Sequence, residues 1–351
     1  MNNPAENLLE LTLNGGWEVF EKIDNSKNTS GGNFSICYKV RRGKEIAFLK
    51  ALDISRALRM KDSLKWLQFL TTAHNYEVEL LEVCSGRSMD KVVSVLDSGE
   101  ILPEENNPLG LPVHYLIFEL ADQTIREHVL GISLDIDNAC LMRSLHNVAV
   151  GISQLHSAGI AHQDLKPSNV LLFDTAGNSK IADLGRAESV QKQSLYFNEN
   201  IAGDPTYAPP ELLYKDLSSD WDVRRKATDL YHLGSLVCFY YTKDPMTTLL
   251  KTFLPTAYNW TNWSGNYEIV LPYLKDAFAE TLAYLDECLR TIFSDAKTCT
   301  EIREIVGYLC DPDPLRRGHP DNRMLPSTRY SMIRFVTIFD RLARAFESKL
   351  L

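Results

Sequence analysis

The first third of the chain carries short apolar runs separated by turns, whereas the remainder carries longer helical patterns. Residues 17–23 alternate apolar and polar side chains, which is typical of a strand with one buried face. The runs at 34–40, 45–50, 92–96 and 113–118 also predict strands. Prolines between the last two runs indicate that a loop connects them. This pattern predicts a small sheet in the first part of the chain.

Helical spacing appears in three longer segments. Residues 54–84 are rich in helix formers, and residues 141–155 carry an apolar stripe that steps by four and three, as a helix on a core does. Asp135 or Asp137 can cap the start of the second helix, and Gly159 can cap its end. A similar stripe is formed by Met332, Phe335, Phe339, Leu342 and Phe346. We expect this last helix to dock on the C-terminal part.

Candidate chemistry gathers in the loop after the second helix, between it and an apolar run at 170–173. Asp164 can accept a proton, and Lys166 leaves an extended loop on the same side because it lies two residues on. Asn169 offers a carboxamide oxygen, which suits magnesium. A second short strand pattern follows and ends at Asp183. Two hard oxygen donors on adjacent loops, beside a candidate base, indicate metal-assisted phosphoryl transfer.

Composition narrows the class of protein. The chain has 351 residues, enough for one large or two modest domains. Its formal net charge of −9 argues against a nucleic-acid partner. The seven cysteines are scattered without a Cys-x-x-Cys pair, which fits a reducing compartment and no zinc site. The longest apolar stretch, 230–241, is too short to span a bilayer, and the start lacks signal-peptide features. We therefore expect a cytoplasmic protein without a membrane partner.

The loop His162-Gln163-Asp164-Leu165-Lys166-Pro167-Ser168-Asn169, followed by Asp183-Leu184-Gly185, resembles the catalytic and metal-binding loops of protein kinases. The resemblance covers about residues 17–320. It implies an α+β, bilobal protein-kinase fold with a small, mostly β N-lobe and a larger, mostly α C-lobe. We expect a lead-in at residues 1–16, the N-lobe at 17–121, and the C-lobe with its C-terminal helix at 122–351.

The resemblance also implies a site for ATP. Residues 30–37 are similar to a degenerate glycine-rich loop, with Gly32 at its middle glycine, Phe34 at its tip and Cys37 over the adenine. Phe118 would close the back of the adenine pocket, and the backbone groups of Glu119 and Ala121 would bond the adenine edge.

The strand that ends in Lys50 resembles the kinase strand whose lysine binds the nucleotide phosphates. Residues 76–81 resemble the helix whose glutamate holds that lysine, with Glu77 as the expected partner and Glu79 as the alternative. The segment between Lys50 and Glu77 is longer than is usual for the family. We therefore expect an extra helical turn or short helix within it.

For the transfer step, the resemblance implies that Asp164 is the base and that Lys166 offsets charge on the transferred group. Asn169 and Asp183 would bind Mg²⁺. Lysine at 166, followed by Pro-x-Asn, goes with serine/threonine specificity in the family, so the expected partner is a protein substrate with a serine or threonine acceptor. The oligomeric state stays open.

Further residues match the family's C-lobe. Residues 203–211 resemble the end of an activation segment, and Glu211 would pair with Arg317. Asp229 resembles the core-helix aspartate that holds the catalytic-loop backbone. Gln163 stands where many kinases carry the arginine that receives an activation-segment phosphate. We therefore expect that activity does not depend on a phosphate being present at Ser194, Tyr196 or Thr206, so that it is retained when all three are mutated to Ala or Phe. Asp204 replaces a threonine that often contacts the base.

The sequence thus predicts an ATP-dependent protein serine/threonine kinase. Two alternatives remain open at this level. One is a pseudokinase scaffold that binds nucleotide without efficient transfer. The degenerate glycine-rich loop and Asp204 favour it slightly, but a more weighty argument against it is that the chain keeps Lys50, Glu77, Asp164, Asn169 and Asp183. The other is a small-molecule kinase of the same fold, against which Lys166 and the Pro-Glu segment both argue.

Overall fold

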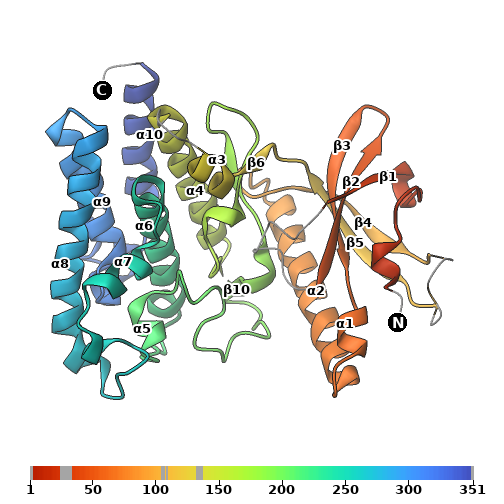
Figure 1. The fold of residues 1–351 in the computed structure, drawn as a ribbon, viewed down its shortest axis with the longest axis horizontal. Helices are drawn as coiled ribbons and strands as arrows, with labels where there is room; N and C mark the ends of the chain where they lie inside the picture. The colour runs from red at the N-terminus through yellow and green to blue at the C-terminus, as the bar shows by residue number, and fades with distance from the viewer. Residues whose placement is uncertain (1–2, 24–33, 104–106, 108–109, 132–136, 349–351) are drawn as a thin grey trace. The chain divides into compact units, whose positions relative to one another are not determined.

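The computed structural model describes residues 3–23, 34–103, 107, 110–131 and 137–348. The chain forms two compact units, Met1–Ala121 and Asp122–Leu351, and each is described by itself (Figure 1). The first unit is rich in strands and the second is mostly helical, which confirms the expected α+β class.

The N-terminal unit contains a five-stranded sheet in the order β1-β2-β3-β5-β4, with every neighbouring pair antiparallel. Two helices, α1 and α2, follow β3 in the chain (Figure 1). The expected short helix before the Glu77 helix is confirmed by α1. The bounds are β1 Glu18–Ile23, β2 Ser35–Arg42, β3 Glu45–Leu52, α1 Ser55–Leu58, α2 Ser63–Gly86, β4 Val95–Ile101 and β5 Val113–Glu119.

One strand lies later in the chain than its sequence pattern predicted. We expected a strand at 92–96 and a loop from residue 97, but β4 continues to Ile101. Its polar residues suit an edge strand, where one side faces no neighbouring strand, and Gly99 pairs with Tyr115 of β5. A β-carbon at Gly99 would lie 2.7 Å from the Tyr115 hydroxyl, so glycine permits this close pairing.

The core of the N-terminal unit includes part of the lead-in segment. Leu8 and Leu13 are buried together with Trp17, Leu49 and Ile117. Residues before β1 are therefore part of the core of this unit.

The C-terminal unit is mostly helical and carries short strands in its first part. Its two small sheets have the orders β6-β8-β9 and β10-β7. The strands are β6 Gln123–Thr124, β7 Ile160–Ala161, β8 Val170–Leu172, β9 Ser179–Ile181 and β10 Glu188–Ser189. The helices are α3 Ile125–Gly131, α4 Asn138–Ser157, α5 Pro210–Leu213, α6 Ala227–Thr242, α7 Met246–Phe253, α8 Tyr267–Ile292, α9 Ala296–Cys310 and α10 Ile333–Glu347.

Helix α4 begins and ends at the predicted signals. Asp137 is its N-cap and accepts a hydrogen bond from the Cys140 amide, while Asp135 lies outside the described residues. Gly159 follows the helix with φ of +70°, a conformation that glycine adopts without strain. The helix therefore ends just before β7, which leads into the Asp164 loop.

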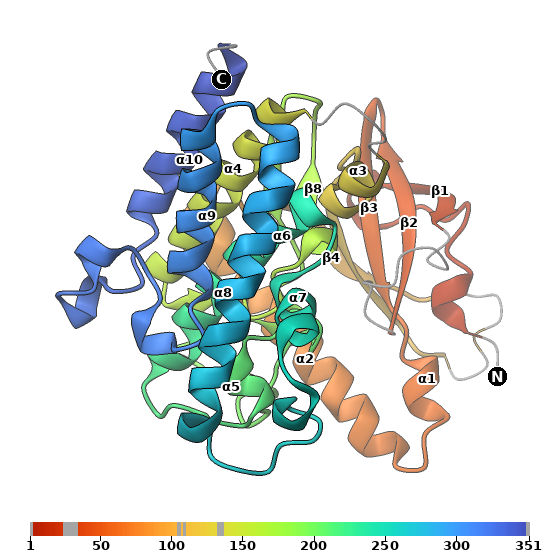
Figure 2. The same cartoon turned by 60° about the vertical axis from the view of Figure 1, so that its left-hand side comes forward.

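The C-terminal helix α10 docks on the C-terminal unit, as predicted, and packs against α4 (Figure 2). Phe335, Phe339 and Leu342 of α10 are buried. The guanidinium of Arg143 on α4 also bonds Glu347 at 2.8 Å and Asp340 at 2.8 Å on α10. Apolar packing and this ion pair together fix α10. Among the described residues, no helix has both the length and the apolar character needed to cross a membrane.

A buried ion pair joins the start of α5 to the loop after α9. The Arg317 guanidinium bonds both carboxylate oxygens of Glu211 at 2.6 Å, so the predicted pairing is present. Arg317 also donates to the Asp311 carbonyl at 2.8 Å. Both side chains are almost fully buried, so each charge depends on the other for compensation.

We predict that Arg317→Met or Glu211→Gln lowers the free energy of unfolding of the C-terminal unit by roughly 3–5 kcal/mol, because each leaves one buried charge unpaired. Chemical denaturation followed by tryptophan fluorescence measures this loss. The control is Arg344→Met, which removes an ion pair with Asp340 in which the arginine is largely exposed. It should change stability by about 1 kcal/mol or less. Equal effects of the two arginine variants would contradict the prediction.

Candidate active site

In the N-terminal unit, Lys50 and Glu77 form the expected pair. Lys50 lies on β3, and its ammonium is 2.9 and 3.1 Å from the two carboxylate oxygens of Glu77 on α2. Glu77 is buried, whereas the alternative partner Glu79 is exposed. The strand and the helix thus hold an ammonium and a carboxylate in a fixed pair that keeps Lys50 extended.

The residues predicted to surround a nucleotide base lie on the same sheet. Cys37 of β2 is buried and stands opposite Lys50 in the β2–β3 register. Phe118 ends the buried part of β5, with its ring 6.5 Å from that of Phe48. The amide of Glu119 donates to the Ser94 carbonyl at 3.3 Å.

Two other predicted residues lie just outside the strands, Phe34 before β2 and Ala121 after β5. The ring of Phe34 stacks against that of Trp66 on α2, with 6.1 Å between centroids. Gly32 lies outside the described residues. Ala121 is the last residue of the N-terminal unit and is half-buried.

In the C-terminal unit, a buried carboxylate on α6 holds the start of the catalytic-loop candidate. Asp229 accepts hydrogen bonds from the amides of His162 at 2.8 Å and Gln163 at 2.9 Å. The His156 ring nitrogen lies 2.8 Å from the same carboxylate. Burial opposes ionisation of Asp229, but the hydrogen bonds and the charge of His156 lower its pKa below the ordinary value. The ionised carboxylate therefore fixes the loop backbone.

Gln163 has a backbone that few residues other than glycine adopt, with φ of +65°. Its side-chain amide donates to Asp229 at 3.1 Å and to the Arg225 carbonyl at 2.9 Å. These bonds hold the left-handed conformation, which directs the chain from β7 into Asp164.

Asp164 is buried among groups that contact both of its oxygens. One oxygen accepts from the Asp204 amide at 2.8 Å, and the other lies 3.1 Å from the Lys166 ammonium. The side-chain amide of Asn169 donates to the Asp164 carbonyl at 2.8 Å. Burial raises the pKa of Asp164; the charge of Lys166 opposes this rise and that of Asp183 adds to it. The carboxylate is thus held in one orientation with a raised pKa, which suits a proton acceptor.

The two candidate magnesium ligands flank the two strands of one hairpin. Asn169 precedes β8 and Asp183 follows β9, and the register pairs Val170 with Ile181. The Ala182 amide donates to the Asn169 carbonyl at 2.9 Å, so the Asn169 and Asp183 backbones lie side by side. Amide and carboxylate oxygens are the hard donors that magnesium prefers, so the donor set fits this ion.

Gly203 is a residue of this site that the sequence did not single out. A β-carbon there would lie 2.5 Å from the Gln163 carbonyl oxygen and 2.6 Å from an Asp164 carboxylate oxygen. Only glycine therefore lets the segment before Asp204 approach the candidate base. The available signal was its place just before Asp204, in the stretch that resembled an activation-segment end.

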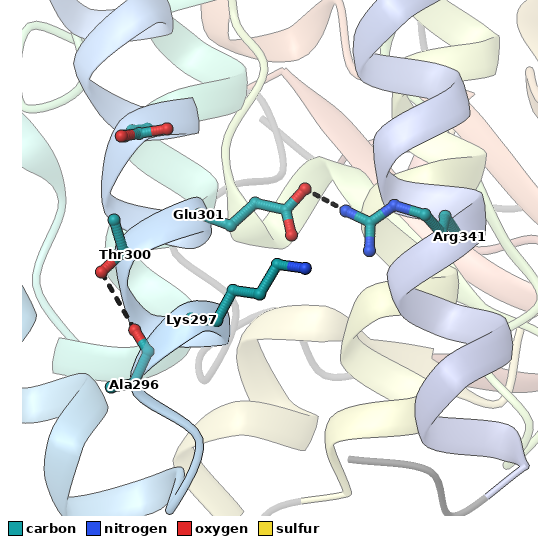
Figure 3. Close-up of a pocket in the computed structure, with 6 residues that line it drawn as sticks. Ala296, Lys297, Thr300, Glu301 and Arg341 are labelled. Carbon is teal, nitrogen blue, oxygen red and sulfur yellow. Dashed lines mark hydrogen bonds and ion pairs between the residues drawn. The ribbon is translucent and has the colours of Figure 1, made fainter.

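A separate surface pocket of about 690 Å³ lies between α9 and α10. Figure 3 shows Glu301 of α9 bonded to Arg341 of α10, with Lys297 beside them. The lining residues are Ala296, Lys297, Thr300, Glu301, Glu304 and Arg341, which all belong to these two helices. The pocket is therefore distinct from the Asp164 loop.

Comparison with known proteins gives one family and several relatives. The family model described as "Protein kinase domain" matches residues 26–314. Human "Cyclin-dependent kinase-like 2" is 26% identical over 234 residues, which are 64% of this chain and 41% of that protein. The rat protein of the same name is 26% identical over 316 residues, 83% of this chain and 55% of the relative.

A third relative is the "Calcium/calmodulin-dependent protein kinase kinase cmkC" of Emericella nidulans. It is 29% identical over 158 residues, 43% of this chain and 28% of the relative. The chain spans about half the length, or less, of these curated relatives.

We predict that Asp229→Asn loosens the loop that carries Asp164. Asparagine keeps the size of the side chain but loses its charge. Its NH₂ group, which is itself a donor, must face one of the N–H groups that now donate to the carboxylate. A hydrogen bond to a charged group is worth about 1.5–3 kcal/mol, so the free energy of unfolding should fall by about 2 kcal/mol or more. Hydrogen exchange at residues 160–166 and chemical denaturation measure the two effects.

The matched control is Asp222→Asn, whose carboxylate pairs with Lys226 at a partly exposed position. It should alter neither the exchange of residues 160–166 nor stability by more than about 1 kcal/mol. Unchanged exchange in Asp229→Asn would show that the carboxylate does not hold the loop.

Proposed function

Because the chain belongs to the protein kinase domain family, we propose that it transfers the γ-phosphoryl group of ATP to a serine or threonine hydroxyl of a protein substrate. The observation that carries the proposal is the single loop in which Lys166 and Asn169 both contact Asp164. Phosphoryl transfer needs an aligned hydroxyl and compensated charge more than covalent chemistry, and this loop offers groups for both.

Each group in the loop has a chemical role in the proposal. Asp164 accepts the proton of the acceptor hydroxyl while the new O–P bond forms and the bond between the γ-phosphorus and ADP breaks. Lys166, 3.1 Å from Asp164, offsets the charge of the transferred group. Its position two residues after the base supports a serine or threonine acceptor by family resemblance.

Asn169 and Asp183 would hold Mg²⁺ through their side-chain oxygens. The hydrogen bond from the Asn169 NH₂ to the Asp164 backbone supports this, because it commits the amide nitrogen and leaves the carboxamide oxygen as a ligand. When bound, the ion neutralises charge on the phosphates. Lys50, held by Glu77, would bind the nucleotide phosphates as a compact positive charge.

The two alternatives are less well supported by the described residues. A scaffold that only binds nucleotide has no need for an Asp164 carboxylate that the Asp204 amide and the Lys166 ammonium hold in one orientation. A small-molecule kinase has no need for the segment that brings the Asp204 amide to Asp164. The relative cmkC is a protein kinase kinase by its name, which also supports a protein substrate.

We predict that Asp164→Ala lowers transfer of labelled phosphate from Mg-ATP to generic protein substrates by about 10²–10⁴-fold, the usual contribution of a positioned base. The thermal shift caused by Mg-ATP should remain, because Asp164 is not a proposed phosphate ligand. The control Asp276→Ala changes an exposed aspartate on α8 and should leave transfer unchanged.

Each other result points to a different function. A thermal shift without transfer in the wild-type chain would identify a nucleotide-binding scaffold. Transfer to aminoglycosides or choline, but not to proteins, would identify a small-molecule kinase. Equal transfer by the wild type and Asp164→Ala would show that the base is wrongly assigned.

The pH dependence should reflect the environment of Asp164. The base acts only when deprotonated, so the rate falls as pH falls through its pKa. Because burial raises this pKa, the acidic limb of kcat/KM should lie at higher pH than an exposed aspartate would give. Lys166 lowers the same pKa, so Lys166→Met should move the limb to still higher pH as well as slowing transfer.

A pH series with saturating and limiting substrate measures the limb. Lys226→Met serves as the control, since Lys226 pairs with Asp222 instead. A limb that moves to lower pH in Lys166→Met would contradict the assigned electrostatics.

A further inference from the structure

A second buried ion pair lies beside the catalytic loop, and the chemistry proposed above does not use it. Glu188 is on β10 and is fully buried. Arg225 is 1% exposed and belongs to a π-helical turn, Asp222–Lys226, just before α6. One guanidinium nitrogen of Arg225 lies 3.6 Å from a Glu188 carboxylate oxygen. Such a pair costs desolvation energy, so its retention calls for a structural or functional reason.

Arg225 connects this pair to the catalytic loop. Its guanidinium donates to the Gln163 side-chain oxygen at 3.2 Å, and the Gln163 NH₂ donates back to the Arg225 carbonyl at 2.9 Å. Gln163 is the residue immediately before Asp164 and shares the Asp229 carboxylate with the loop backbone. A shift of Arg225 would therefore be felt at the backbone that presents the base.

The same arginine holds the segment that follows β10. Arg225 donates to the Phe197 carbonyl at 2.9 Å. Its neighbour Arg224 donates to the carbonyls of Phe197 and Glu199, both at 3.0 Å. Single π-helical turns are frequent at functional sites, and here the turn presents two successive arginines to one segment. We call residues 188–199 the tethered segment.

Glu188 supplies the negative charge inside the tethered segment. Its strand β10 pairs with β7, with Glu188 opposite Ala161, the residue before His162. The Ser194 hydroxyl donates to the Glu188 carboxylate at 2.6 Å and accepts from the Tyr196 amide at 2.9 Å. The Tyr196 ring lies under the Arg186 guanidinium, at 4.0 Å from the centroid. The buried Glu188 carboxylate thus binds Ser194 within the tethered segment and Arg225 outside it.

In many regulated proteins a phosphate added to such a segment supplies the charge that pairs with an arginine and orders the segment. Here the carboxylate of Glu188 already fills that role. We propose that Glu188 and Arg225 are positioning residues that hold the tethered segment and the Asp164 loop together, and that phosphorylation of Ser194 releases them and lowers activity. The proposal rests on the function proposed above and concerns its regulation.

The expected effect of a phosphate at Ser194 follows from the surrounding charges. A protein kinase would form the bond from the Ser194 oxygen to the γ-phosphorus of ATP, break the bond to ADP and release the hydroxyl proton. The product carries about −1.5 to −2 charges at the position now 2.6 Å from the Glu188 carboxylate. It also loses the hydroxyl donor. Repulsion at a buried carboxylate is weakly screened, so the segment must move away.

Ser194 is placed where an enzyme can reach it. It is half-buried, and Lys192, Gln193 and Leu195 around it are exposed. The hydroxyl needs only a local opening of the turn at residues 191–195 to become accessible, whereas Glu188 and Arg225 stay in the interior. Phosphorylation of Ser194 near the surface can therefore act on the buried Glu188–Arg225 pair.

The first experiment uses Glu188→Gln and Arg225→Met in the full chain to test whether this ion pair holds the tethered segment and the Asp164 loop together. We expect faster hydrogen exchange in residues 188–199 and a 10-fold or larger loss of kcat, with KM for ATP changed less than threefold. Arg225→Lys, which keeps the charge, should lose less. Lys226→Met, in the same turn but paired with Asp222, is the control. If both variants kept wild-type exchange and wild-type kcat, the positioning role of Glu188 and Arg225 would be wrong.

The second experiment tests the sign of modification at Ser194. Ser194→Asp and a chain carrying phosphoserine at 194 should both lose at least 10-fold in kcat. Ser194→Asn, whose side chain is neutral and nearly isosteric with that of aspartate, should lose less than threefold. In a Glu188→Gln background the penalty of Ser194→Asp relative to Ser194→Asn should shrink, because the repelling charge is gone. Activation by phosphoserine, or equal activities of Asp and Asn at 194, would overturn the proposal.

The two readouts separate this proposal from the proposed function. If neither wild type nor Asp164→Ala transfers phosphate, the enzyme assignment fails, but exchange in residues 188–199 still shows whether Glu188, Arg225 and the charge at 194 control the segment. If wild type is active and exchange in every variant matches it, the regulatory proposal alone fails.

Discussion

The buried carboxylate of Asp229 is the constraint on which the C-terminal unit's site depends. It is fully buried, yet it accepts from two successive loop amides and faces His156, and these bonds keep it ionised. An ionised group in the interior is tolerated only when its partners are fixed. Helix α6 therefore cannot shift without disturbing the loop of Asp164. For this reason α6 and the Asp164 loop are expected to move together.

Asp164 itself is positioned by groups from distant parts of the chain. The Asp204 amide and the Lys166 ammonium hold its two oxygens, and Gly203 makes the close approach of that amide sterically allowed. Burial raises its pKa while Lys166 limits the rise. A carboxylate that is oriented and only partly stabilised as an anion is suited to take up a proton. The geometry thus supports acid–base chemistry without any large rearrangement of the loop.

Membership of the protein kinase domain family accounts for the elements that this chain has in common with its relatives. The Glu188–Arg225 pair and the glutamine at 163 concern how the site is kept in order. Many kinases carry at this position an arginine that pairs with an activation-segment phosphate. Gln163 of this chain instead has a neutral side-chain amide that bridges Arg225 and Asp229. The charge that tethers the neighbouring segment is built into the sequence as Glu188. Under the regulation proposed above, the site is ordered by folding itself, and an added charge at Ser194 acts against it.

The sequence by itself determined the elements whose signals are local. Strand and helix periodicity gave both parts of the α+β fold, and short motifs placed Lys50, Glu77, the Asp164 loop and Asp229 in elements that the structure contains. Roles in catalysis stay predictions. Tertiary structure alone decided where β4 runs, because its polar residues are stabilised by pairing with β5. It alone revealed Gly203 and the Glu188–Arg225 pair. A close approach or a buried charge pair depends on which distant segments meet, and no local spacing records that.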